Sequence, residues 1–154
     1  MAEGPMICSD FFYMSTDEAG STPMLVVKST RSGRISATAL EQKGVTAHGV
    51  RFMAEVMVRT GLRKFINFSD NESSLLLLKA AAARSVKGAE AIPKECPVGD
   101  HAANGHAESA VRQVKDQMRT IRIGLERKLR RVLEETDPIL TWLPTFAADA
   151  VSIF

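Results

Sequence analysis

Three carboxylates in this 154-residue sequence stand where a surface role is not the obvious explanation. Asp10 interrupts an apolar and aromatic segment from Met6 to Met14, where a buried charge is costly. Asp70 follows an alternating segment, Lys64 to Phe68, and Glu108 lies about one turn into a helical pattern. Two-metal phosphoryl transfer needs a few carboxylates that converge on ions about 4 Å apart. Asp10, Asp70 and Glu108 are therefore candidate catalytic and metal-binding residues.

Each of these carboxylates also has an ordinary explanation. Asp70, or Asn71 beside it, can cap the start of the following helix, and Glu108 can complement a helix N-terminus. Asp10 can lie on an exposed strand edge. Most acidic residues in proteins are exposed, so the residues alone leave these alternatives open.

The hydrophobic pattern predicts the elements that position the first two carboxylates. Three successive strands are expected at 6–14, 24–27 and 35–40, with a turn at Arg31-Ser32-Gly33. A helix should begin after Thr46 as its cap and end at Gly61. A fourth strand at 64–68 then runs into Ser69-Asp70-Asn71-Glu72, which is typical of a helix start.

The second half of the chain is mainly helical in pattern. A helix is expected at 75–86 and a short strand at 89–93, and Asn104-Gly105 opens the longest helical pattern. Asp137-Pro138 marks the start of another helix, and Pro144 can kink this helix. The apolar stripe of the long helix is Val111, Val114, Met118, Ile121, Leu125 and Leu129. The element order predicts an α/β fold, a mixed sheet flanked by helices.

The ordered motifs resemble the integrase catalytic cores of retroviruses and long-terminal-repeat retrotransposons. The likeness rests on Asp10 in a first strand, Ser69-Asp70-Asn71 after a fourth, and Asn104 to Glu108 opening a long helix, and it covers nearly the whole chain. The 37 residues between Asp70 and Glu108 are close to the family spacing. The resemblance implies an RNase H-like fold with a mixed five-stranded sheet.

The resemblance also implies an activity and its cofactor. Asp10 would bridge two metals, with Asp70 completing one site and Glu108 the other, and the cofactor would be Mg²⁺ or Mn²⁺. The enzyme would be a polynucleotidyl transferase that processes DNA 3′ ends and joins them to target DNA. Its partners would be the retroelement ends, target DNA and further copies of itself.

The resemblance and the composition together set expectations for organisation and location. We expect residues 1–154 to form one domain, a core fragment of a longer polyprotein, because the family's amino-terminal zinc module and carboxy-terminal DNA-binding module are absent from the sequence. With no signal pattern and no long apolar run, we expect an intracellular protein without a membrane partner, in the nucleus or in a retroelement particle.

A basic face on the long helix points to nucleic acid. The window 111–131 holds eight Lys or Arg residues and two acidic ones, although the whole chain carries only +2. Four of the cations recur at spacings of three and four beside Glu108, namely Arg112, Lys115, Arg119 and Arg122. In the family, the positions of Arg112 and Lys115 contact the DNA end. The alternative is a solvated charged face.

A second basic cluster and two other groups of residues are weaker signals. Arg127, Lys128, Arg130 and Arg131 either contact a nucleic-acid backbone or complement the helix dipole. Cys96, His101 and His106 lack a second cysteine for a zinc site, and Cys8 and Cys96 should be reduced thiols. Trp142, Leu143 and Phe146 are interpreted as core, with a dimer face as the alternative.

One departure from the family motif keeps other functions open. Glu72 stands where the family often has glycine, and its charge either crowds the metal site or points outward. A decayed or domesticated core would bind nucleic acid without catalysis. An RNase H-type nuclease or a transposase would use the same acidic residues on another substrate.

Overall fold

The computed structural model describes residues 4–14, 22–97 and 104–153. These residues form one five-stranded sheet in the order β3-β2-β1-β4-β5. Strands β1, β2 and β3 pair antiparallel, whereas β1, β4 and β5 pair parallel. The elements are β1 (Met6–Phe12), β2 (Met24–Ser29), β3 (Ile35–Ala39), α1 (Ala47–Thr60), β4 (Lys64–Ser69), α2 (Ser73–Ser85), β5 (Glu90–Glu95), α3 (Gly105–Leu129), the 3-10 turn η2 (Pro138–Thr141) and α4 (Leu143–Ile153).

Local sequence signals explain where the helices begin and end. The Thr46 side chain accepts a hydrogen bond from the Gly49 amide at 3.1 Å, and so caps α1 as predicted. Gly61 ends α1 in the left-handed conformation at φ 69°, which favours glycine. Asp137 accepts a hydrogen bond from the Ile139 amide and starts η2.

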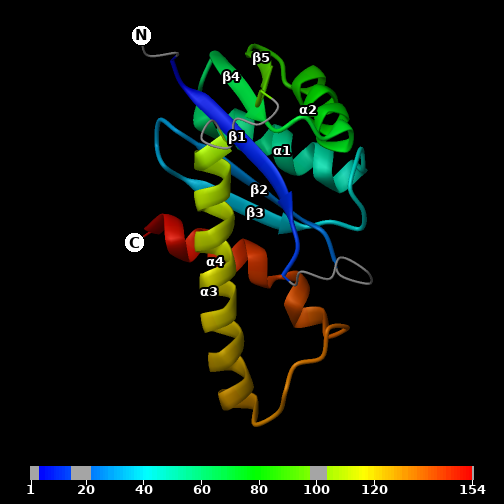
Figure 1. The fold of residues 1–154 in the computed structure, drawn as a ribbon, viewed down its shortest axis with the longest axis vertical. Helices are drawn as coiled ribbons and strands as arrows, with labels where there is room; N and C mark the ends of the chain where they lie inside the picture. Colours follow the sequence, from blue (N-terminus) through cyan, green and yellow to red (C-terminus); the bar gives the residue numbers. More distant parts are fainter. Residues whose placement is uncertain (1–3, 15–21, 98–103, 154) are drawn as a thin grey trace.

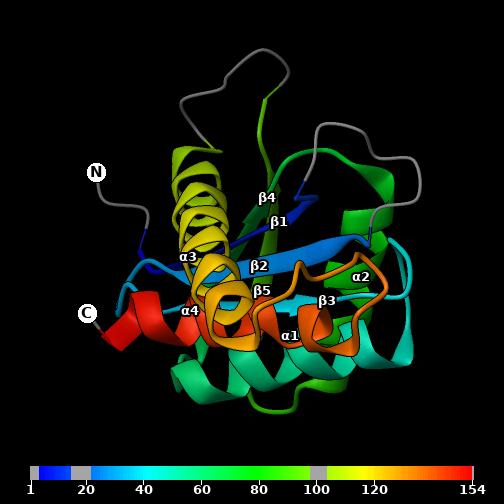
Figure 2. The same cartoon turned by 90° about the horizontal axis from the view of Figure 1, so that it is seen from below.

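The sheet is covered on both faces. Helices α1 and α2 bury Met53, Leu75 and Leu78 against residues of β1 and β2 that include Ile7 and Leu25. On the opposite face, α3 and α4 cover a second cluster that contains Phe12, Val26, Val114, Met118 and Ala147. Figure 1 shows α3 crossing the sheet and extending beyond it, and Figure 2 shows the same helices from below. No helix in the described ranges is long and apolar enough to cross a membrane.

The predicted mixed sheet with flanking helices is confirmed, and the differences lie towards the C-terminus. Leu129 is 42% exposed, so the buried stripe of α3 ends earlier than predicted. The last helical segment is divided into η2 and α4, and Pro144 occupies the second position of α4, where no helical hydrogen bond is lost.

The interpretation of the last segment as core is right for Leu143, which is buried, and wrong for Trp142 and Phe146. Their side chains are 61% and 58% exposed, and their rings stack with centroids 6.5 Å apart. The physical reason is the orientation of α4, which turns Leu143, Ala147 and Ala148 towards the sheet and α3. Because Trp142 and Phe146 are themselves four residues apart, they share the outward side.

Candidate active site at the ends of two parallel strands

Asp10 lies in β1, and Asp70 directly follows the end of the neighbouring parallel strand β4. Strands β1 and β4 pair through Cys8 and Phe68, and each aspartate follows its paired residue by two positions. Neighbouring strands lie about 4.8 Å apart, so this register places the two carboxylates side by side at one edge of the sheet. The pairing of β1 with β4 therefore brings Asp10 and Asp70, which come from different elements, close to each other.

The first turn of α3 packs on the same strand pair. Ala107 is fully buried in a small cluster with Cys8 and Phe68. Side chains two apart on a strand share a face, so Asp10 in β1 lies on the same face as Cys8, which α3 covers. Glu108 directly follows Ala107 and is exposed. The helix thus carries the third carboxylate to this edge of the sheet.

The charge of Asp70 acts on Asp10. Burial, followed by the negative charge of Asp70, raises the pKa of Asp10 from 3.8 to about 7. Glu72 adds to this effect, whereas the amide of Phe11 and the charge of Lys43 oppose it. A half-buried carboxyl beside a second carboxylate is a site that gains free energy by binding a cation.

Glu72 is held by a cation, and its side chain does not cap the helix. Its Oε1 accepts hydrogen bonds from Lys43 Nζ at 2.9 Å and from Ser74 Oγ at 3.2 Å. Lys43 Nζ also lies over the rings of Phe11 and Tyr13, at 5.6 and 5.2 Å from their centroids. The acidic residue that departs from the family motif is therefore paired with a lysine of the β3–α1 connection.

The capping explanation for Asp70 is partly right. Asp70 Oδ1 accepts a hydrogen bond from the Glu72 amide at 3.2 Å. Glu72 is the cap residue of α2 and makes no side-chain capping bond, while Asn71 is exposed. A carboxylate with two oxygens can accept this bond through one oxygen and still bind a metal through the other.

Sequence reasoning missed a buried lysine behind this edge of the sheet. Lys79 on α2 is only 2% exposed, and its Nζ donates to Ser69 Oγ at 2.9 Å. Burial lowers the pKa of Lys79, and the charges of Glu95 and Asp70 oppose this effect. A lysine within the apolar run of α2 was the available signal, because lysine is almost never fully buried without partners.

The donor set fits a divalent metal in part. Carboxylate oxygens are the ligands that Mg²⁺ and Mn²⁺ prefer, and Asp10 and Asp70 supply them next to each other. Within residues 4–14, 22–97 and 104–153, no three His, Cys, Asp or Glu side chains are grouped closely enough to hold one ion. Glu108 therefore has to approach the aspartates for the predicted triad to assemble.

The predicted basic face of α3 separates into two kinds of residue. Arg112 is exposed and Lys115 is half-buried, and neither forms an ion pair with any residue that the structure describes. Arg119 pairs with Asp116 at 3.2 Å on the surface. Arg112 and Lys115 thus remain the best-placed cations beside Glu108.

Arg122 has a structural role that the spacing did not reveal. Its guanidinium contacts Glu126 at 3.2 Å and Glu135 at 3.3 Å, and it also donates to the Leu133 carbonyl. Burial works against its charge, but the hydrogen bonds to the two glutamates raise the pKa of Arg122 overall. The contacts tie the end of α3 to the segment that follows it.

The distal basic cluster and the cysteines complete the predicted set. Arg127, Lys128 and Arg130 are exposed, and Arg131 pairs with Asp137 at 3.0 Å. Cys8 and Cys96 do not form a disulfide with each other, and burial raises the pKa of Cys8 to about 11. His101 lies outside the described residues.

Comparisons by sequence find no relatives for this chain. No protein-family model matches it, and no curated protein matches it.

Solved integrase structures share the architecture. A chain of the simian T-cell lymphotropic virus intasome, solved in complex with the PP2A regulatory subunit B56 gamma, matches with a TM-score of 0.64 and 12% identity. The match covers 93% of this chain and 46% of that chain, so this chain spans less than half of its length. The catalytic core domain of BIV integrase matches with a TM-score of 0.56 and 13% identity, over 94% of this chain and 81% of that one. At these identities the likeness establishes the fold alone, and the chain has the RNase H-like fold of integrase catalytic cores.

Proposed function

We propose that this chain is an integrase catalytic core that cuts and joins DNA by metal-dependent phosphoryl transfer. The observation that carries the proposal is the register of β1 and β4, which sets Asp10 beside Asp70. The packing of Ala107 on Cys8 and Phe68 supports it, because this contact carries Glu108 to the same edge. The RNase H-like fold is consistent with such a site.

Each residue has a role that its surroundings support. Asp10 and Asp70 would hold Mg²⁺ or Mn²⁺ between the strand ends, and Glu108 would complete the site from α3. When bound, the ions activate the attacking oxygen and stabilise the leaving one. Lys43 neutralises Glu72, so that the extra carboxylate does not compete for the same cation. Arg112 and Lys115, one and two turns after Glu108, would contact the phosphates of the DNA end.

The proposed partners are retroelement ends, target DNA and a second copy of the chain. One structure with this fold belongs to an intasome. The exposed aromatic pair Trp142 and Phe146 supports self-association, because large apolar groups grouped on a surface are typical of interfaces. We further propose that the nucleus or a retroelement particle is the site of action.

Strand cleavage and disintegration of a branched DNA substrate test the activity. Wild type is compared with Asp70→Asn, Glu108→Gln and the exposed control Glu41→Gln, with Mg²⁺, Mn²⁺ or EDTA. We expect metal-dependent products from wild type and control, and a loss of at least about a hundredfold in the two site variants. Equal activity in all four proteins would contradict the assignment.

A second candidate function is a core that binds nucleic acid without catalysis. The exposure of Glu108, and the absence of a grouped metal-binding trio among the described side chains, favour it over an RNase H-type nuclease. Its signature is DNA binding that depends on salt and not on metal, together with no cleavage by wild type. Preference for an RNA/DNA hybrid would instead support the nuclease.

A further inference from the structure

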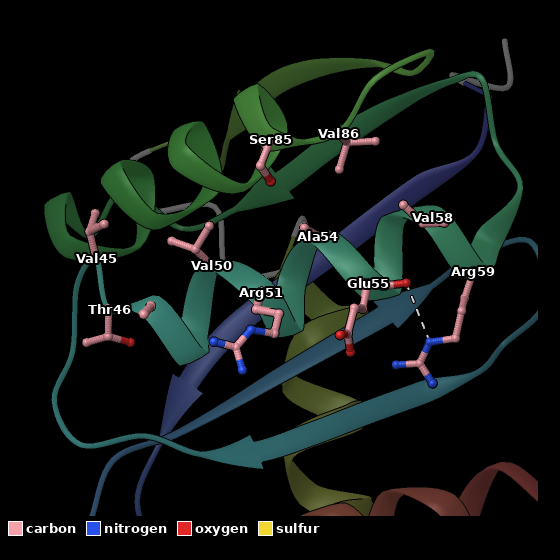
Figure 3. Close-up of a pocket in the computed structure, with 11 residues that line it drawn as sticks. Val45, Thr46, Val50, Arg51, Ala54, Glu55, Val58, Arg59, Ser85 and Val86 are labelled. Carbon is pink, nitrogen blue, oxygen red and sulfur yellow. Dashed lines mark hydrogen bonds between the residues drawn. The ribbon is translucent and has the colours of Figure 1, made fainter.

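Two hollows border α1, and their linings differ in chemistry. Figure 3 shows the first, a groove of about 870 Å³ along the outer side of α1. Val50, Ala54 and Val58 follow one side of the helix there, and Arg51, Glu55 and Arg59 follow the other. This groove is largely apolar, and no residue of the candidate active site lines it.

The second hollow is small and polar. It has a volume of about 180 Å³ and lies between the β2–β3 turn and the C-terminal end of α1. Three arginines line it, and no acidic residue is among the described side chains of its lining. The residues that matter for its chemistry are Arg31, Arg34, Arg59, Ser29, Ser36 and Thr60. We call this set the arginine pocket.

The arginine pocket is built on fixed backbone. The turn that carries Arg31 and Arg34 is closed by a hydrogen bond from the Gly33 amide to the Ser29 carbonyl at 2.9 Å. A second bond runs from the Ser29 amide to the Arg34 carbonyl at 3.1 Å, and Gly33 has φ 75°. Ser29 and Ser36 are buried strand residues that form part of the wall. The two turn arginines are thus presented by a well-defined hairpin.

The charge of the pocket is only partly compensated. Arg34 reaches Asp149 at 3.5 Å, but both side chains are about half exposed, and such surface pairs contribute little. Arg59 Nε donates to the backbone carbonyl of Glu55 at 3.4 Å. The other N–H donors of this guanidinium are left to bind a ligand. Converging cations repel each other unless an anion lies between them. The lining therefore favours a ligand with several negative oxygens.

We propose that the arginine pocket binds a phosphate group. The guanidinium group matches phosphate oxygens with paired donors, and the hydroxyls of Ser29 and Ser36 can complete the coordination, whereas the Thr60 hydroxyl donates to the Met57 carbonyl. The volume corresponds to about six waters at ~30 Å³ each, which suits one phosphate group. The phosphate belongs either to a nucleic-acid backbone or to a free phosphate compound.

The pocket is separate from the carboxylate site. Asp10 pairs with Val26 on β2, whereas Ser29 of the pocket pairs with Ile7 near the start of β1. Three residues of strand correspond to about 10 Å. The proposal requires neither metal nor catalysis, so it can succeed where the proposed function fails, and the reverse also holds.

Titration with inorganic phosphate, followed by amide NMR in EDTA, tests the pocket. The test variant combines Arg31→Gln, Arg34→Gln and Arg59→Gln. Its control combines Arg51→Gln, Arg84→Gln and Lys87→Gln, which removes the same charge from other exposed positions. We expect saturable shifts at 29–36 and 59–60 in wild type and control, and at least about tenfold weaker binding in the test variant. No saturable shifts in wild type, or equal binding by both variants, would overturn the proposal.

A second experiment, which measures DNA binding, identifies the source of the phosphate. Binding of a short duplex is measured at several salt concentrations without metal, with circular dichroism to verify that each variant is folded. If the ligand is a nucleic-acid backbone, the test variant binds more weakly than the control, and its salt slope falls by about one for each lost phosphate contact. Equal DNA binding, together with pocket-specific phosphate binding, assigns the pocket to a free phosphate compound.

Discussion

Asp10 and Asp70 each lie two residues beyond Cys8 and Phe68, the residues that pair β1 with β4. The parallel register therefore sets two carboxylates next to each other before any ligand is considered. Burial and the neighbouring charge raise the pKa of Asp10 to about 7, so Asp10 responds to pH near neutrality.

Asp10→Asn is expected to stabilise the metal-free protein more at pH 8 than at pH 5. The folded-state pKa of about 7 lies above the ordinary value of 3.8, so between these values the folded protein holds a proton that the unfolded chain has released. The free energy of unfolding of wild type thus decreases as pH rises from about 4 to 7, and Asp10→Asn removes this loss. We expect a difference on the order of 2 kcal/mol between pH 5 and pH 8 in urea denaturation with EDTA. The same mutant effect at both pH values would contradict the coupling, and Glu41→Gln serves as the exposed control.

Lys79→Met and Lys79→Ala should differ in stability. Methionine fills the volume of the buried stem and removes the cost of burying the charge, so we expect a loss of less than about 1 kcal/mol. Both variants lose the bond to Ser69 Oγ, which keeps its bond to the Asp70 carbonyl, but alanine also leaves a cavity and should cost about 2 to 3 kcal/mol. Urea denaturation of both variants at pH 7 measures the difference. If methionine costs as much as alanine, the ammonium itself stabilises the fold.

Arg122→Gln should affect stability, whereas Arg112→Gln and Lys115→Gln should affect DNA binding. Arg122 contacts Glu126, Glu135 and the Leu133 carbonyl, and losing the bond to that carbonyl should cost about 1 kcal/mol. The other two cations have no ion pair with a described residue, so their loss should lower affinity for a DNA end and leave the thermal midpoint unchanged. Thermal unfolding and fluorescence anisotropy separate the two effects. Loss of DNA binding in Arg122→Gln without loss of stability would reverse the assignment.

Trp142→Ser and Phe146→Ser should weaken self-association without unfolding the chain. Both side chains are mostly exposed, so each substitution should change the free energy of unfolding by no more than about 0.5 kcal/mol. Sedimentation at several concentrations should show a shift towards the monomer, while Leu77→Ser, a control exposed to 62%, should leave the distribution unchanged. An unaltered distribution in all variants would exclude this surface from the interface.

The sheet and the helices could be predicted from the sequence because they depend on local patterns, whereas the assignment of the carboxylates to a site stays a prediction. Thr46 and Gly61 mark the ends of α1, and the apolar setting of Asp10 identifies it before any contact is known. The pairing of Lys43 with Glu72 and the burial of Lys79 depend on contacts between distant segments, which periodicity does not encode. The exposure of Trp142 likewise depends on how α4 packs against α3 and β3.

Binding of Mn²⁺ in the presence of a short DNA duplex, measured by electron paramagnetic resonance, tests the central claim that the paired aspartates hold a divalent ion. Wild type, Asp10→Asn, Asp70→Asn, Glu108→Gln and the control Glu41→Gln are compared at pH 8. We expect wild type and control to bind equally, and each aspartate variant to bind at least about tenfold more weakly, with a smaller loss for Glu108→Gln because the other ligands remain. Wild-type affinity in both aspartate variants would contradict the account.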